Sequence, residues 1–286
     1  FLSLKKMRKS WVEMNMEAEE RAKSSPVASM PSLDHLSRAD YEHVYEPSDD
    51  TFLFLDALSY EYDKSRPGWR ESRRGDATIQ NINRTLEVGC GTGAITIHFI
   101  KLWQSLSVIN AVGSPKRPPL FHHVTDINPH AINVTKRTAA ANGIICIEGS
   151  LEHQEQCDAT NSVLQTWQCD LASALLNDLS KQIDVIFFNP PYVCTPNEEV
   201  RGCGIEASWA GGVDGRLVLD RALPQIAQLL AFPHGVAYFI SIDENKPHEI
   251  AQQMNDMYGI VVEPLMRRKC KNEYLTLQKM SYKIIE

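Results

Sequence analysis

The sequence predicts an α/β fold with a mostly parallel, doubly wound sheet of seven strands and an antiparallel strand late in the chain. Short apolar segments alternate with amphipathic ones from about residue 39 onward, which is typical of strands joined by crossover helices. The segment 183–188 is apolar apart from Asp184, as expected of a strand buried on both faces. A glycine-rich turn links the first strand to the helix that follows it.

The helices are predicted from their ends and from their apolar spacing. The acidic turn 47–50 supplies capping residues for the first helix of the domain, and Asn142-Gly143 ends a later helix. In chain order, the expected helices are 51–58, 94–103, 129–142, 217–230 and one from Pro247 to about residue 257.

The strands are predicted from short apolar runs bounded by turn residues or carboxylates. In chain order, they are 85–88, 121–125, 167–169, 183–188, 235–241, 261–265 and 274–280. The last of these strands alternates between apolar and polar residues, which suits an antiparallel position.

Three stretches are longer than ordinary connections between elements, namely 59–84, 105–120 and 146–166. We interpret them as surface insertions, so that residues 39–286 form one domain despite their number. Residues 1–38 are interpreted as an N-terminal extension and linker.

This extension has two parts. Leu4, Met7, Trp11 and Met14 recur at helical spacing, whereas 22–38 is rich in Ser, Pro and Ala.

Composition excludes several classes of protein. The chain is 43% hydrophobic and 23% charged, as in globular proteins, and no apolar run approaches the length of a membrane span. Its net charge of −7 disfavours a nucleic acid as the main partner. The seven cysteines show no C-x-x-C pair, so we expect no metal site and a reducing cytosol or nucleus.

The glycine turn has the spacing Gly89-x-Gly91-x-Gly93 and follows Glu87 by two residues. Glycines permit a tight turn and close approach of the backbone to a ligand. The spacing differs from the G-x-G-x-x-G of dinucleotide-binding proteins, and a purely structural turn is the alternative interpretation.

Carboxylates follow the next two strands of the predicted sheet. Asp126 is placed to accept hydrogen bonds from both hydroxyls of a ribose, and Asp170 from the exocyclic amine of adenine. Acidic groups suit a cofactor that has a sulfonium and an amino group but no phosphate. Glu87, Asp126 and Asp170 thus resemble the S-adenosylmethionine site of the Rossmann-like class I methyltransferases.

The fourth predicted strand runs directly into Asn189-Pro190-Pro191-Tyr192. Consecutive prolines fix the backbone and remove its N–H groups, so that carbonyls face the cleft. The side-chain oxygen of Asn189 and the carbonyl of Pro190 can together accept both hydrogens of one planar NH₂ group, and Tyr192 offers a ring face. The alternative is a plain Pro-Pro turn.

Together these motifs resemble the HemK/PrmC-type release-factor glutamine methyltransferases, in their eukaryotic and archaeal branch. The segment 45–52 reads YEPSDDTF, which is similar to that branch's Y-E-P-x-E-D-T-F motif, with Asp49 in place of Glu. The segments 126–129, 189–196, 204–212 and 214–216 also look like that branch. The resemblance covers about residues 41–280, apart from the three insertions.

The resemblance implies roles for individual residues. S-adenosyl-L-methionine is expected to bind to Thr51, Glu87, Gly89, Gly91, Gly93, Asp126, Ile127, Asp170, Leu171 and Asn189. The expected catalytic residues are Asn189, Pro190 and Tyr192, and the substrate-binding residues are Asn189, Pro190, Pro191 and Tyr192.

The implied reaction is N5-methylation of the glutamine side chain in the Gly-Gly-Gln loop of the eukaryotic class I release factor. The resemblance also implies a small zinc-bearing activator subunit, and the sheet edge near 121–124 is a candidate for its binding. Three alternatives remain open: an adenine-N6 DNA or RNA methyltransferase, a histone lysine methyltransferase, and a non-catalytic binding module with the methyltransferase fold.

Overall fold

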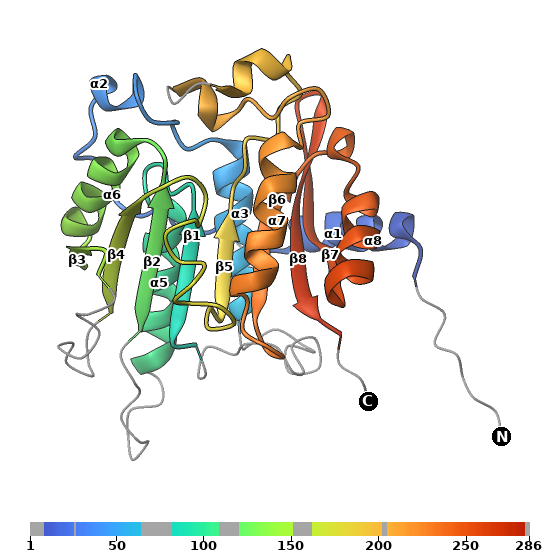
Figure 1. Cartoon of the computed structure of the whole chain (residues 1–286), viewed down its shortest axis with the longest axis horizontal. Helices are drawn as coiled ribbons and strands as arrows, with labels where there is room; N and C mark the ends of the chain where they lie inside the picture. The colour runs from blue at the N-terminus through green and yellow to red at the C-terminus, as the bar shows by residue number, and fades with distance from the viewer. Residues whose placement is uncertain are drawn as a thin grey trace.

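The computed structural model describes residues 9–25, 27–63, 82–108, 120–150, 162–201 and 205–283 (Figure 1). Its strands form one sheet of eight, in the order β3-β4-β2-β1-β5-β6-β8-β7. The strands are β1 (Arg84–Val88), β2 (Phe121–Asp126), β3 (Ile145–Glu148), β4 (Val163–Gln168), β5 (Val185–Phe188), β6 (Val236–Ser241), β7 (Ile260–Cys270) and β8 (Glu273–Tyr282).

The predicted fold class is confirmed. All neighbouring strands from β3 to β6 pair in parallel, and β8 is antiparallel to both β6 and β7. The helices are α1 (Trp11–Ser24), α2 (Arg38–Tyr41), α3 (Asp49–Tyr62), α5 (Ala94–Val108), α6 (Pro129–Ala141), α7 (Leu217–Leu229) and α8 (Pro247–Tyr258). Short 3₁₀ helices span Asn197–Arg201, Ile205–Ser208 and Asp243–Asn245.

The predicted count of seven strands is wrong because the sequence does not reveal β3. This strand has four residues, and within the described chain it pairs with β4 alone. So short an edge strand is indistinguishable from a loop by periodicity. The neighbouring strand β4 also starts earlier than predicted, because Val163 is already paired with Phe121. Residues 64–81, 109–119 and 151–161, in the three predicted insertions, lie outside the described residues.

The prediction that 121–124 forms a sheet edge is also wrong. These residues belong to β2, which lies between β1 and β4 in the middle of one half of the sheet. A strand with two partners has no free backbone groups for another chain. In the described sheet the outermost strands are β3 and β7.

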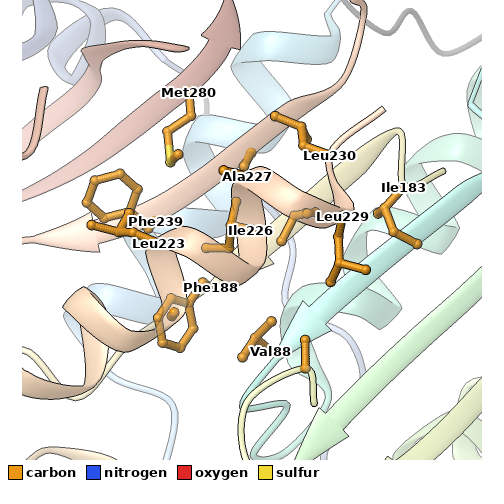
Figure 2. Close-up of a cluster of buried hydrophobic side chains, with 14 of the residues drawn as sticks. Val88, Ile183, Phe188, Leu223, Ile226, Ala227, Leu229, Leu230, Phe239 and Met280 are labelled. Carbon is orange, nitrogen blue, oxygen red and sulfur yellow. The ribbon is translucent and has the colours of Figure 1, made fainter. Parts of the chain in front are cut away.

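Hydrophobic side chains cover both faces of the sheet. Phe187 and Tyr238 belong to the cluster that includes α3 and α5, whereas their neighbours Phe188 and Phe239 belong to the cluster around α7. This alternation follows from the period of two along a strand. Figure 2 shows the second cluster, in which α7 side chains such as Ile226 lie over β-strand residues.

The N-terminal segment packs on the domain. Helix α1 contacts β7, and Arg21 Nη1 donates hydrogen bonds to the carbonyls of Pro264 and Leu265 at 3.0 and 2.9 Å. Further along, the Ala28 amide donates to Asp56 Oδ1 on α3 at 2.7 Å. The stretch predicted as a linker therefore makes specific contacts, and it leads to the end of the sheet where the site lies.

Candidate active site

The carboxyl ends of the parallel strands open into one cleft. Figure 1 shows α2 and the segment after β5 gathered at that end of the sheet. Most of the predicted site residues line this cleft, namely Thr51, Glu87, Gly89, Gly91, Asp126, Ile127, Asp170, Leu171, Asn189 and Pro191. Gly93, Pro190 and Tyr192 lie next to lining residues but do not line the cleft themselves.

The glycine turn exposes backbone to the cleft at two of its three glycines. Gly89 and Gly91 have φ values of +69° and +52°, and a Cβ at either position would meet no atom within 4 Å. Gly93 has another role, because a Cβ there would come within 2.9 Å of the Thr135 side chain. Gly93 thus permits close packing of α6 against the turn, whereas the other two leave room for a ligand.

Glu87 lies at the floor of the cleft and is only 2% exposed. The backbone amide of Thr96 donates a hydrogen bond to its Oε2 at 3.0 Å. Burial outweighs this bond and raises the pKa of Glu87 to about 8. A buried carboxylate of this kind favours a cationic partner.

Asp126 is positioned by the backbone of two loops. The Gly91 amide donates to its Oδ2 at 3.0 Å, and the Asn128 amide donates to its Oδ1 at 2.9 Å. Burial raises the pKa of Asp126, although these backbone bonds oppose the shift. Ile127, which follows it, is 45% exposed and offers an apolar surface in the cleft.

Asp170 is placed differently from the other two acids. It forms an ion pair with Arg221 of α7, and its side chain is 49% exposed. Both residues line the cleft, so the positive charge of Arg221 offsets the negative charge of Asp170 on that side of the cleft. Leu171 has a φ of +52°, a conformation that residues other than glycine rarely adopt. Where such residues do occur, they are concentrated at functional sites.

Asn189 follows β5 and is held by Asp50 of α3. Its Nδ2 donates a hydrogen bond to Asp50 Oδ2 at 3.0 Å, and the Tyr192 hydroxyl donates to the same oxygen at 3.4 Å. The other end of the amide, Asn189 Oδ1, is buried without a hydrogen-bond partner in the described part of the chain. An unsatisfied buried acceptor in a cleft points to a bound donor.

The backbone of the segment 189–192 is fixed by a close contact. Asn245 Nδ2 donates to the carbonyl of Tyr192 at 2.9 Å and to that of Asp214 at 3.0 Å. A Cβ on Gly215 would lie 2.1 Å from the Tyr192 carbonyl oxygen, so only glycine fits there. The Asp-Gly-Arg motif of the sequence therefore supports the segment that carries Asn189.

Sequence reasoning missed several residues of the site. His43, Val44 and Arg221 line the cleft and carry no signal in the sequence. Tyr45 and Pro47 also line it, but they belong to the turn 45–50, which the motif predicts to lie over the cofactor. Asp50 belongs to the same turn, but the sequence does not predict its contact with Asn189. An acidic residue at the start of a helix is explained by its favourable interaction with the helix N-terminus. The hydrogen bond of Asp50 with Asn189, 139 positions further along the chain, leaves no pattern in the neighbouring sequence.

The sheet order and the acidic cleft at the strand ends define a class I methyltransferase. No protein-family model matches the chain. Human Methyltransferase HEMK2 is 34% identical over 251 residues, which cover 88% of this chain and 95% of that protein. The eRF1 methyltransferase catalytic subunit mtq2 of Schizosaccharomyces pombe is 30% identical over 254 residues, with shares of 88% and 95%.

The chain therefore belongs to the HEMK2 family of methyltransferases, which confirms the resemblance found in its motifs. A solved structure of E. cuniculi Mtq2 in complex with Trm112, described as responsible for the methylation of eRF1 translation termination factor, has the same fold. It covers 84% of this chain and 99% of that chain, with a TM-score of 0.50 and 21% identity.

No helix in the described ranges is long and apolar enough to cross a membrane. Over the same ranges, no group of three or more His, Cys, Asp or Glu side chains is arranged to hold a metal ion.

Proposed function

We propose that the chain transfers a methyl group from S-adenosyl-L-methionine to the side-chain nitrogen of the glutamine in the Gly-Gly-Gln loop of the eukaryotic class I release factor. The observation that carries this proposal is the Oδ1 of Asn189, which is buried without a hydrogen-bond partner among the described residues. The names of the relatives agree, since the S. pombe protein is an eRF1 methyltransferase subunit.

The residues of the cleft fit the cofactor. Asp126 would bind the ribose hydroxyls, Glu87 would face the positively charged part, and Asp170 with Leu171 would lie at the adenine. Gly89 and Gly91 leave open space beside the backbone, and Thr51 of α3 also lines the cleft. S-adenosyl-L-methionine supplies an electrophilic methyl group on its sulfonium.

The acceptor side needs position more than a strong base. An amide nitrogen is a poor nucleophile because its lone pair is delocalised into the carbonyl. Asn189 Oδ1 and the Pro190 carbonyl would accept its two hydrogens and hold the nitrogen in line with the methyl group. The amide nitrogen would form its bond to the methyl carbon as the sulfur–carbon bond breaks, and it would then release one proton to solvent.

A small zinc-bearing activator subunit is the proposed partner, since the E. cuniculi relative forms a complex with Trm112. Of the two outermost strands described, β7 is contacted by α1. The other, β3, carries Ile145, which is 52% exposed. We therefore assign the partner to β3 rather than to the interior strand β2.

The test uses purified chain with its activator, methyl-labelled cofactor, and four separate acceptors: release factor, histone, DNA and RNA. We expect label in the release factor, and none when its acceptor glutamine is replaced by glutamate. Label only in a nucleic acid or a histone would contradict the proposal, and no transfer to any acceptor would favour a binding module.

A further inference from the structure

Asp50 accepts hydrogen bonds from the segment 189–192, and the proposed reaction leaves its function open. It lies in the first turn of α3, is 3% exposed and does not line the cleft. A buried carboxylate is costly unless its oxygens accept hydrogen bonds. The partners of the two oxygens therefore indicate what the residue does.

These partners lie on two different segments. Oδ1 accepts from the Thr51 amide at 2.7 Å and from the Thr51 hydroxyl at 3.4 Å. Oδ2 accepts from Asn189 Nδ2 at 3.0 Å and from the Tyr192 hydroxyl at 3.4 Å. One carboxylate thus joins the start of α3 to both ends of the segment 189–192.

The contact decides which way the Asn189 amide points. A side-chain amide has a donor end and an acceptor end of nearly equal size, so only its partners fix its orientation. A carboxylate offers acceptors alone, so Nδ2 must face Asp50. The remaining end is Oδ1, which is buried without a partner among the described residues and belongs to a residue that lines the cleft.

Tyr192 reinforces this arrangement. Burial, and next the negative charge of Asp50, raise the pKa of Tyr192 above its ordinary value. The phenol therefore stays protonated at neutral pH and donates to Asp50. The two donor groups at the ends of the segment are both directed to one carboxylate, away from the acceptor.

We propose that Asp50 is a positioning residue that holds the Asn189 amide with its oxygen toward the cleft. The site then takes groups that present a planar NH₂, such as a carboxamide, and rejects the matching carboxylate, whose oxygen would face another oxygen. Asp50 acts through Asn189 and touches no reacting atom. This inference rests on the proposed function and specifies how that site selects its acceptor.

The first test is Asp50→Asn, which keeps the shape of the side chain. The new amide has two possible orientations. If its NH₂ faces Asn189, the Asn189 amide must turn and present its own NH₂ to the cleft. If its NH₂ faces Thr51 instead, it meets the Thr51 amide, which is also a donor. A charged hydrogen bond contributes about 1.5–3 kcal/mol, so we expect kcat to fall about 10–100-fold. The Kd of S-adenosyl-L-methionine, measured by calorimetry, should stay within about threefold.

The matched control is Asp49→Asn, which removes the same charge from the preceding, exposed position. It should retain the kcat of the wild-type chain. A loss of kcat equal to that of Asp50→Asn would mean that general charge, rather than orientation, explains the effect.

The second variant exchanges the two side chains, as Asp50→Asn with Asn189→Asp. The exchange puts a donor at position 50 and a carboxylate at position 189, which again leaves an oxygen toward the cleft. We expect it to turn over about tenfold faster than Asn189→Asp alone, in which two carboxylates face each other. Relief of charge repulsion alone would give the same gain with Asp50→Ala and Asn189→Asp, which supplies no donor, so this second pair should remain slower than the exchanged pair.

Three results would overturn the inference: wild-type kcat in Asp50→Asn, a loss of cofactor affinity as large as its loss of kcat, or an exchanged pair no faster than Asn189→Asp. Failure of the proposed function is a separate outcome. In that case the wild-type chain labels another acceptor, and the effect of Asp50→Asn is measured on that acceptor.

Discussion

The two halves of the cleft are built in different ways. The cofactor half consists of a glycine turn and carboxylates at the carboxyl ends of strands β1, β2 and β4, and backbone amides hold Glu87 and Asp126. The acceptor half depends on side chains from segments far apart, because Asp50 of α3 orients Asn189 after β5. Changes in one half should therefore affect binding, and changes in the other should affect turnover.

The largest effect is expected at Asn189. Asn189→Ala removes the proposed acceptor of the substrate NH₂, and loss of one such preorganised contact lowers kcat by about 10²–10³-fold. The Kd of S-adenosyl-L-methionine should change by less than about tenfold, because the other cofactor contacts remain. Steady-state kinetics and calorimetry on one preparation would measure both, and near wild-type turnover would break the comparison.

Asp126 should show the opposite behaviour. Asp126→Ala removes the ribose acceptor and also the anchor of the Gly91 amide, so cofactor affinity should fall by about 10–100-fold. At saturating cofactor, kcat should stay near that of the wild-type chain. Asp178→Ala, at an exposed position, is the control, and an unchanged Kd in Asp126→Ala would contradict the assigned role.

Substitutions in the glycine turn can separate the cost of backbone strain from the cost of steric overlap. Gly91→Ala meets only the cost of its positive φ, about 1–2 kcal/mol. Gly93→Ala has the same kind of strain and also overlaps Thr135 at 2.9 Å. We expect the free energy of unfolding to fall more for Gly93→Ala in denaturant titrations, and equal losses would show that Thr135 moves aside.

The smallest effect concerns pH and Glu87. Burial raises the folded-state pKa of Glu87 to about 8, so the stability gained from its protonated form is present at low pH and lost as the pH rises through 8. A cationic cofactor prefers the ionised form, so its affinity should rise about fivefold from pH 7 to pH 8. Calorimetry should detect proton release on binding.

The variant Glu87→Gln should abolish the part of this pH dependence that belongs to Glu87. A pH profile identical to that of the wild-type chain would assign the titration to another group, such as Asp126, whose pKa is also raised by burial.

The same comparison explains what could be predicted from sequence. The cofactor half follows local rules: strands end, glycines turn, and carboxylates at strand ends share one edge of a sheet. Asn189 was found because it continues a buried strand. The contact of Asp50 with Asn189 could not be predicted, because Asn189 is distant along the chain and an acidic residue at a helix start already has a local explanation.

Element boundaries show a similar limit. The interior strands β5 and β6 are buried at every position and mostly apolar, so the sequence predicts them, whereas the mixed strand β4 starts at Val163 and is predicted only from residue 167. The edge strand β3 has four residues and one described partner, which leaves too little pattern to detect. The assignment of the sheet edge to 121–124 failed for a related reason, since strand order is a property of the whole chain.

The central claim is that the cleft delivers a methyl group to a planar amide held by Asn189. The most direct measurement is tandem mass spectrometry of release factor incubated with the chain, its activator and S-adenosyl-L-methionine. We predict one added methyl group on the side-chain nitrogen of the glutamine in Gly-Gly-Gln, and almost none with Asn189→Ala. A methyl group on a lysine or on the backbone, or equal methylation by Asn189→Ala, would contradict the account.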